Sequence, residues 1–203
     1  MKSFKHLLFS SALLLLTASA SAQSNSSFFN QELIVNGSAD QFDSSNELLN
    51  WKIKDGYKYS MTAKQYKNAD FSNEHIPSGE SADSWLFCGK GNGLFDSSPS
   101  ASYQDISIPE SAWELIDNSL TTAYMSAKIG GYEKQNDHIQ IIYSFQDQNN
   151  SPLQEITLGP VEADERNNTT QLLEKAQSVT VPAGTRKIQV TLIATETDWG
   201  SDV

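Results

Sequence analysis

The chain alternates between apolar and polar residues in short runs that are separated by turn residues. Alternation with a period of two is typical of β-strands that bury one face. The pattern is clearest in the second half of the chain, where β-branched residues are frequent. It predicts strands there over residues 123–129, 139–145, 153–158, 178–181 and 188–193.

The first half of the chain carries the same signal in a less regular form. Two short apolar runs flank the turn sequence Asp55-Gly56, which suits a tight hairpin between residues 51–53 and 57–61. A continuously apolar run at residues 85–88 is typical of a strand that is buried on both faces. Further strands are predicted at residues 32–36 and 103–108.

The best helical segment is short and covers residues 109–118, with Pro109 in its first turn and acidic residues near its start. The apolar runs predict about nine or ten strands, which is typical of an all-β sandwich or barrel. No linker rich in proline or serine divides the chain. We therefore expect residues 32–203 to form a single β-sandwich domain with one short helix.

The N-terminal segment has the features of a secretory signal peptide. Lys2 and Lys5 supply a basic start, residues 7–16 form a mostly apolar run, and Ala20-Ser21-Ala22 is a small-residue cleavage motif. The apolar run is too short, and has the wrong flanks, for a permanent membrane span. We therefore expect residues 1–22 to be removed, the protein to be secreted or periplasmic, and residues 23–31 to form a flexible lead.

Composition narrows the range of partners and of chemistry. Acidic residues outnumber basic ones 25 to 14, for a net charge of −11, which argues against nucleic acid or an anionic membrane surface as partner. The single cysteine, Cys88, excludes an intrachain disulfide and is expected to be a buried core residue. No G-x-S-x-G, H-E-x-x-H or P-loop motif is present. The sequence therefore favours a protein that is not an enzyme and that requires no cofactor.

Several segments resemble one known family. They are YMSAKIGG at residues 124–131, IIYSFQD at 141–147, LGPV at 158–161, DERNNTT at 164–170 and VPAGTR at 181–186. With LIVNG at residues 33–37 and Trp51, they resemble the galactose-binding-like jelly-roll domains of secreted bacterial proteins, which are similar to carbohydrate-binding modules. The resemblance covers most of residues 32–195, and it implies a jelly-roll β-sandwich.

The resemblance also implies a last strand and a metal site. In such domains one more strand follows the position of residues 198–203. We expect this strand to be missing from the chain, and we therefore expect an unpaired sheet edge and a strand-pairing partner or homo-oligomer. Many relatives hold a structural Ca²⁺ between the first and last strands. The candidate ligands in this chain are Asp40, Asp43 and Asp202, because Ca²⁺ prefers carboxylate oxygens.

Loop aromatics are the candidate ligand contacts, because sugars stack on exposed aromatic faces and loops on a rigid β scaffold commonly bind ligands. The long polar segment 63–83 contains Tyr66, Phe71 and His75, while Tyr132 and Trp199 lie in other predicted loops. The alternative is that these side chains merely cover the ends of the sandwich.

The sequence favours a secreted, non-enzymatic module that binds carbohydrate on a cell surface or a matrix polymer. Two alternatives stay open at this stage. One is a structural or adhesive surface protein that binds protein partners. The other is a small secreted hydrolase that uses a pair of loop carboxylates.

Overall fold

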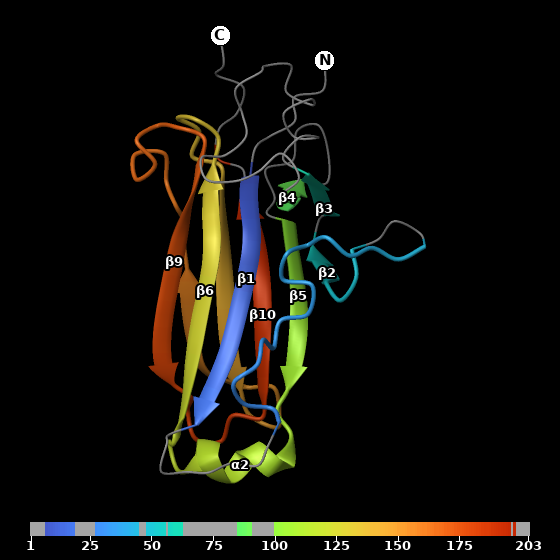
Figure 1. Ribbon diagram of the computed structural model, residues 1–203, viewed down its shortest axis with the longest axis vertical. Helices are drawn as coiled ribbons and strands as arrows, with labels where there is room; N and C mark the ends of the chain where they lie inside the picture. Colours follow the sequence, from blue (N-terminus) through green and yellow to red (C-terminus); the bar gives the residue numbers. More distant parts are fainter. Residues whose placement is uncertain are drawn as a thin grey trace.

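Two antiparallel five-stranded sheets face each other in the structure, a computed structural model that describes residues 7–18, 27–44, 48–55, 57–62, 85–90, 100–195 and 197 (Figure 1). The strands of the first sheet are β1 (Leu7–Ala18), β3 (Tyr57–Thr62), β4 (Trp85–Lys90), β6 (Thr121–Gly131) and β9 (Gln171–Thr180), in the order β3-β4-β1-β6-β9. Those of the second are β2 (Lys52–Asp55), β5 (Ser100–Ser107), β7 (His138–Gln146), β8 (Pro152–Leu158) and β10 (Lys187–Thr195), in the order β2-β5-β10-β7-β8. The predicted all-β sandwich is confirmed.

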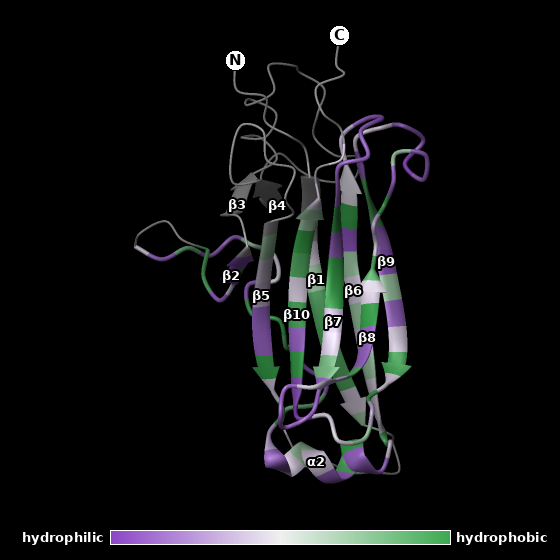
Figure 2. Cartoon of the chain, turned by 180° about the vertical axis from the view of Figure 1, so that it is seen from behind, coloured by the Kyte–Doolittle hydropathy of each residue, from purple (hydrophilic) through white to green (hydrophobic). Residues whose placement is uncertain are grey.

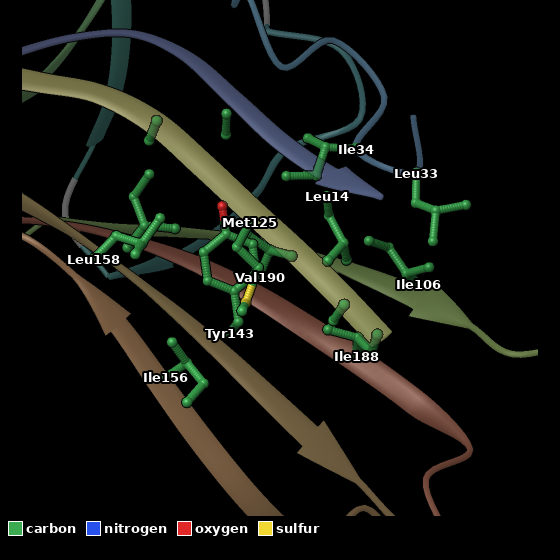
Figure 3. Packing of buried hydrophobic residues seen from close by; sticks show 14 of the residues in the cluster. Leu14, Leu33, Ile34, Ile106, Met125, Tyr143, Ile156, Leu158, Ile188 and Val190 are labelled. Carbon is green, nitrogen blue, oxygen red and sulfur yellow. The ribbon is translucent and has the colours of Figure 1, made fainter. Parts of the chain in front are cut away.

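The core lies between the two sheets and follows the period-two pattern of the sequence. Alternate residues of β6, β7 and β10 point inward and are buried, as in the series Ile139, Ile141, Tyr143 and Phe145 of β7. Three inward side chains meet between the sheets, namely Met125 of β6, Tyr143 of β7 and Val190 of β10 (Figure 3). Burial of each such side chain contributes about 1.5–3 kcal/mol, so these three strands supply much of the core's stability.

The strands predicted in the second half of the chain are all present, and β9 is longer than predicted. It begins at Gln171 rather than at residue 178 and pairs with β6 along most of its length. Most of the side chains of β9 are exposed or half-buried, because it lies at the edge of its sheet. An edge strand needs little hydrophobic alternation, so its first half gave no signal in the sequence.

The predicted hairpin around Asp55-Gly56 is wrong. Strand β2 pairs with β5 in the second sheet, whereas β3 pairs with β4 in the first sheet. The chain therefore crosses from one sheet to the other at the point where the hairpin was expected. A local turn signal reports a change of direction, and it does not determine which sheet the next strand joins.

The strand predicted at residues 32–36 is also absent, apart from a single bridge between Glu32 and Leu15. Asn36 has a positive φ of 55°, and its side chain accepts hydrogen bonds from the N–H groups of Asp40 and Gln41. Its amide nitrogen also donates to the carbonyl of Leu49. The buried Asn36 therefore organises a loop at this position in place of a strand.

Strand β1 consists of residues that the sequence assigns to the signal peptide. It pairs with β6 from Leu7 opposite Gly131 to Ala18 opposite Thr121, and its other edge meets β4 at the pair Phe9 and Phe87. The run is mostly apolar, and the inward residues of β1, Ala12, Leu14 and Leu16, are buried in the core. Residues 27–31 of the expected flexible lead lie beside it, with Phe29 buried in the core.

Helix α2 (Glu110–Asp117) confirms the helical prediction and lies across one end of the sandwich (Figure 1). Arg186 fixes it there, with its guanidinium 4.5 Å from the ring centre of Trp113 and two hydrogen bonds to the Asp117 carboxylate at 2.8 and 2.9 Å. The hydrogen bond from Arg186 is the main reason why the pKa of Asp117 is lowered. The helix therefore closes the core at this end.

Candidate ligand-binding surfaces

Most of the site residues predicted from the sequence lie outside the described residues, namely Tyr66, Phe71, His75, Trp199 and Asp202, as does the side chain of Cys88. Tyr132 is described. It follows β6 directly, is half-buried, and its carbonyl accepts a hydrogen bond from the N–H of Gln135 at 3.0 Å. A loop position for Tyr132 is therefore confirmed, whereas its role in binding stays a prediction.

The loop that contains Tyr132 is fastened by a fully buried arginine. The guanidinium of Arg166 donates to the carbonyls of Glu133 at 2.8 Å, Gln135 at 2.7 Å and Thr169 at 2.6 Å. Gly131 allows this packing, since a Cβ at that position would lie 3.0 Å from Nη2 of Arg166. Arg166 therefore joins the loop after β6 to the loop before β9 at the end of the sandwich opposite α2 (Figure 1).

Asp137, in the same loop as Tyr132, binds the segment that precedes the predicted contact Trp199. Its carboxylate is buried and accepts a hydrogen bond from the N–H of Thr197 at 2.7 Å. The chain shortly before Trp199 is thus held against the loop of Tyr132. His138 is the first residue of β7, and its Nδ1 lies 3.5 Å from the carboxylate of Glu162.

The two described calcium candidates lie in the loop that Asn36 organises. Asp40 and Asp43 are both exposed, and the backbone N–H of Asp40 donates to the side chain of Asn36 at 3.0 Å. Within the described ranges, no group of three or more His, Cys, Asp or Glu side chains is placed to hold a metal ion. The calcium site therefore stays a prediction.

The second sheet carries a surface that the sequence analysis did not single out, which we call the polar face. It is the outer face of β2, β5, β10, β7 and β8, which lie side by side in Figure 2 and alternate between hydrophilic and hydrophobic residues. Two cross-strand rows lie on it: Lys52, Tyr103, Thr191, Ile142 and Thr157, and next to them Asp105, Gln189, Ser144 and Glu155. Within these rows Thr191 and Ser144 are themselves buried.

Asp105 is the centre of the contacts on the polar face. Its carboxylate accepts a hydrogen bond from Nε2 of Gln189 at 2.9 Å, and the ammonium groups of Lys52 and Lys187 lie 3.5 and 3.6 Å away. Partial desolvation raises the pKa of Asp105, but the Gln189 hydrogen bond and the two lysines outweigh it, so that the pKa lies below its usual value. Asp105 is therefore ionised and held in place at neutral pH.

Tyr103 lies beside this charged group. Its ring is half-buried, and Nζ of Lys52 lies 5.5 Å from the ring centre. Neighbouring rows of a sheet face are about 7 Å apart along the strand, so the ring of Tyr103 and the Asp105–Gln189 pair can touch the same small ligand. The polar face thus combines an aromatic surface with fixed hydrogen-bond donors and acceptors and a balanced set of charges.

The polar face could not be found by searching for motifs, because its residues come from strands far apart in the sequence. Tyr103 and Asp105 are two residues apart on one predicted strand, so they lie on the same face of it. Gln189 lies on another predicted strand, and the period-two pattern puts all three residues on the outer faces of their strands. Only the register between β5 and β10, which sets Gln189 opposite Asp105, brings them together.

No family model matches the chain, and no curated protein matches it. Among solved structures, the enzymatically active domain of tailspike protein 4 from bacteriophage CBA120 is similar with a TM-score of 0.33 and 14% sequence identity. The similarity covers 81% of this chain and 19% of that one. At this TM-score it identifies neither a fold family nor a function. None of the described helices is long and apolar enough to cross a membrane.

Proposed function

We propose that this protein is a secreted or periplasmic, non-catalytic module that binds neutral carbohydrate through its polar face. The observation that carries the proposal is the ring of Tyr103 beside the hydrogen-bonded pair of Asp105 and Gln189. An aromatic ring offers a flat apolar surface to the C–H face of a sugar. A carboxylate accepts hydrogen bonds from hydroxyl groups, and a primary amide both donates and accepts them.

The charges favour a neutral ligand over an anionic one. The chain carries a net charge of −11, which repels anionic polymers at long range. On the polar face itself, Lys52 and Lys187 are already engaged with Asp105. A sulfated or uronic-acid polymer would have to compete with that carboxylate for the two lysines. We therefore expect binding to depend little on salt concentration.

Replacing Tyr103 with Ala is the first test of the proposal. We expect a loss of about 1–3 kcal/mol of binding free energy, because the variant removes one stacking surface. Gln189→Ala should also weaken binding, since it removes one partner of the ligand and one hydrogen bond to Asp105. Glycan-array screening of the wild type followed by titration calorimetry with the bound neutral glycan measures both effects.

Tyr124→Ala is the matched control, because Tyr124 is a half-buried tyrosine on the outer face of the other sheet. It should lower the melting temperature about as much as Tyr103→Ala and leave glycan binding unchanged. Tyr132→Ala tests the loop site predicted from the sequence. If Tyr132→Ala abolishes binding and Tyr103→Ala does not, the site lies at the loops, and if no neutral glycan binds the wild type, the proposed function is wrong.

A further inference from the structure

Strand β1 lies in a gap whose two edges both form hydrogen bonds to it. Strand β6 pairs with it along one edge. The other edge of β1 pairs with β4 at one position, and further along it residues 30–37 lie beside β1 in place of β4. There the N–H groups of Asn30 and Leu33 donate to the carbonyls of Leu16 and Leu14 at 2.7 and 2.9 Å. The gap is therefore bordered by backbone groups that require a strand between them.

Two further groups fit the backbone of β1. The carboxylate of Glu32 accepts hydrogen bonds from the N–H of Leu14 at 2.9 Å and from the N–H of Ile34 at 2.8 Å. Gly37 accepts from the N–H of Ala12 at 3.1 Å, and a Cβ on Gly37 would lie 2.3 Å from the carbonyl oxygen of Ala12. An occupant of this gap therefore needs N–H groups at both positions, which excludes proline there.

The inner wall of the gap is apolar. The side chains of Ala12, Leu14 and Leu16 point into the core and are buried, whereas Leu13 and Leu15, between them, are only half-buried. Tyr143 of the opposite sheet reaches across the core and donates its hydroxyl to the carbonyl of Leu13 at 3.3 Å. If β1 left, the apolar core and the hydrogen-bonding edge of β6 would both be open to solvent.

The sequence pattern predicts that β1 does leave, because the expected cleavage follows Ala22 and β1 ends at Ala18. We propose that the position of β1 is an exchangeable strand site: after the leader is cut, the gap beside β6 binds one extended peptide segment from a partner protein. The peptide has small or aliphatic side chains at the three positions that Ala12, Leu14 and Leu16 occupy in β1. It has no proline at the first two of these positions. Strand addition of this kind uses main-chain hydrogen bonds for affinity and alternate side chains for specificity. This inference is independent of carbohydrate binding.

The test begins with the folded full-length chain, so that folding does not depend on removing β1. A recognition sequence for a specific protease replaces residues 19–26, and the chain is cut after purification. A fluorescently labelled peptide of residues 1–18 is then added in excess, both in buffer and in urea below the unfolding transition. We expect the label to coelute with the protein, and the unlabelled segment to be released. The uncut chain should take up no label, because its site is occupied.

Two substituted peptides distinguish strand insertion from nonspecific binding. The peptide with Leu14→Thr and Leu16→Thr changes the inward positions and should bind at least tenfold more weakly than the peptide with Leu13→Thr and Leu15→Thr. Equal binding of the two peptides would overturn the proposal, as would uptake by the uncut chain. Failure of the wild-type peptide to enter the cut protein under either condition would overturn it as well.

Discussion

Arg166→Met is expected to lower the free energy of unfolding by about 3–5 kcal/mol, which is a large part of the stability of a typical domain. The guanidinium is fully buried and satisfies the carbonyls of Glu133, Gln135 and Thr169. Methionine keeps an unbranched apolar side chain, but it is shorter than arginine and donates no hydrogen bond, so three carbonyls lose their partner. Urea denaturation followed by circular dichroism measures the change.

Arg186→Met is the matched control for this prediction. Arg186 donates two hydrogen bonds to the Asp117 carboxylate, but its side chain and that of Asp117 are partly exposed to solvent, so water can replace the lost contacts. The expected cost is about 1 kcal/mol. If Arg166→Met costs no more than Arg186→Met, Arg166 does not hold the two loops together as described.

Leu14→Ala is expected to destabilise the full-length chain by about 2–5 kcal/mol, because it leaves a cavity in the core. Leu14 is fully buried between the sheets, where it belongs to the same cluster as Met125 and Val190. The protein is produced without export, so that the leader is retained, and the free energy of unfolding is obtained from urea titration.

Leu13→Ala provides the comparison, since Leu13 is the neighbouring residue on the outer, half-buried face of β1. It removes the same atoms and should cost clearly less than Leu14→Ala. Equal effects at the two positions would mean that β1 does not present one face to the core.

The sequence predicts those strands in which every second side chain is buried, because burial makes apolar and polar residues alternate along them. Strands β6, β7 and β10 lie inside their sheets, and their inward residues are apolar at every second position, so the pattern alone locates them. Pro109 and the residues after it likewise locate α2. These features are local, which is why a single sequence is enough to find them.

The remaining features depend on contacts between distant segments. A mostly apolar run such as residues 7–16 is compatible with a signal peptide and with a central strand of a sheet, and nothing local separates the two. The position of Gln189 opposite Asp105 follows from the register of two strands. The buried Arg166 belongs to the segment DERNNTT, which contributes to the family resemblance. Its three carbonyl partners come from two loops, one before β7 and one after β8 in the sequence, so no local pattern reveals the contacts.

The position of β1 is tested most directly by a disulfide between β1 and β6. Leu15 and Tyr124 lie directly opposite each other on the outer face, so cysteines placed there, with Cys88→Ser, are at the separation that a disulfide needs. Cysteines at positions 13 and 124 are displaced by two residues along the strand, and their Cα atoms are about 7–8 Å apart. Under mild oxidation of the folded full-length chain, we predict that the 15–124 pair forms a disulfide rapidly and that the 13–124 pair does not. No disulfide at 15–124, or equal yields for the two pairs, would contradict the placement of residues 7–18 as the central strand of the sheet.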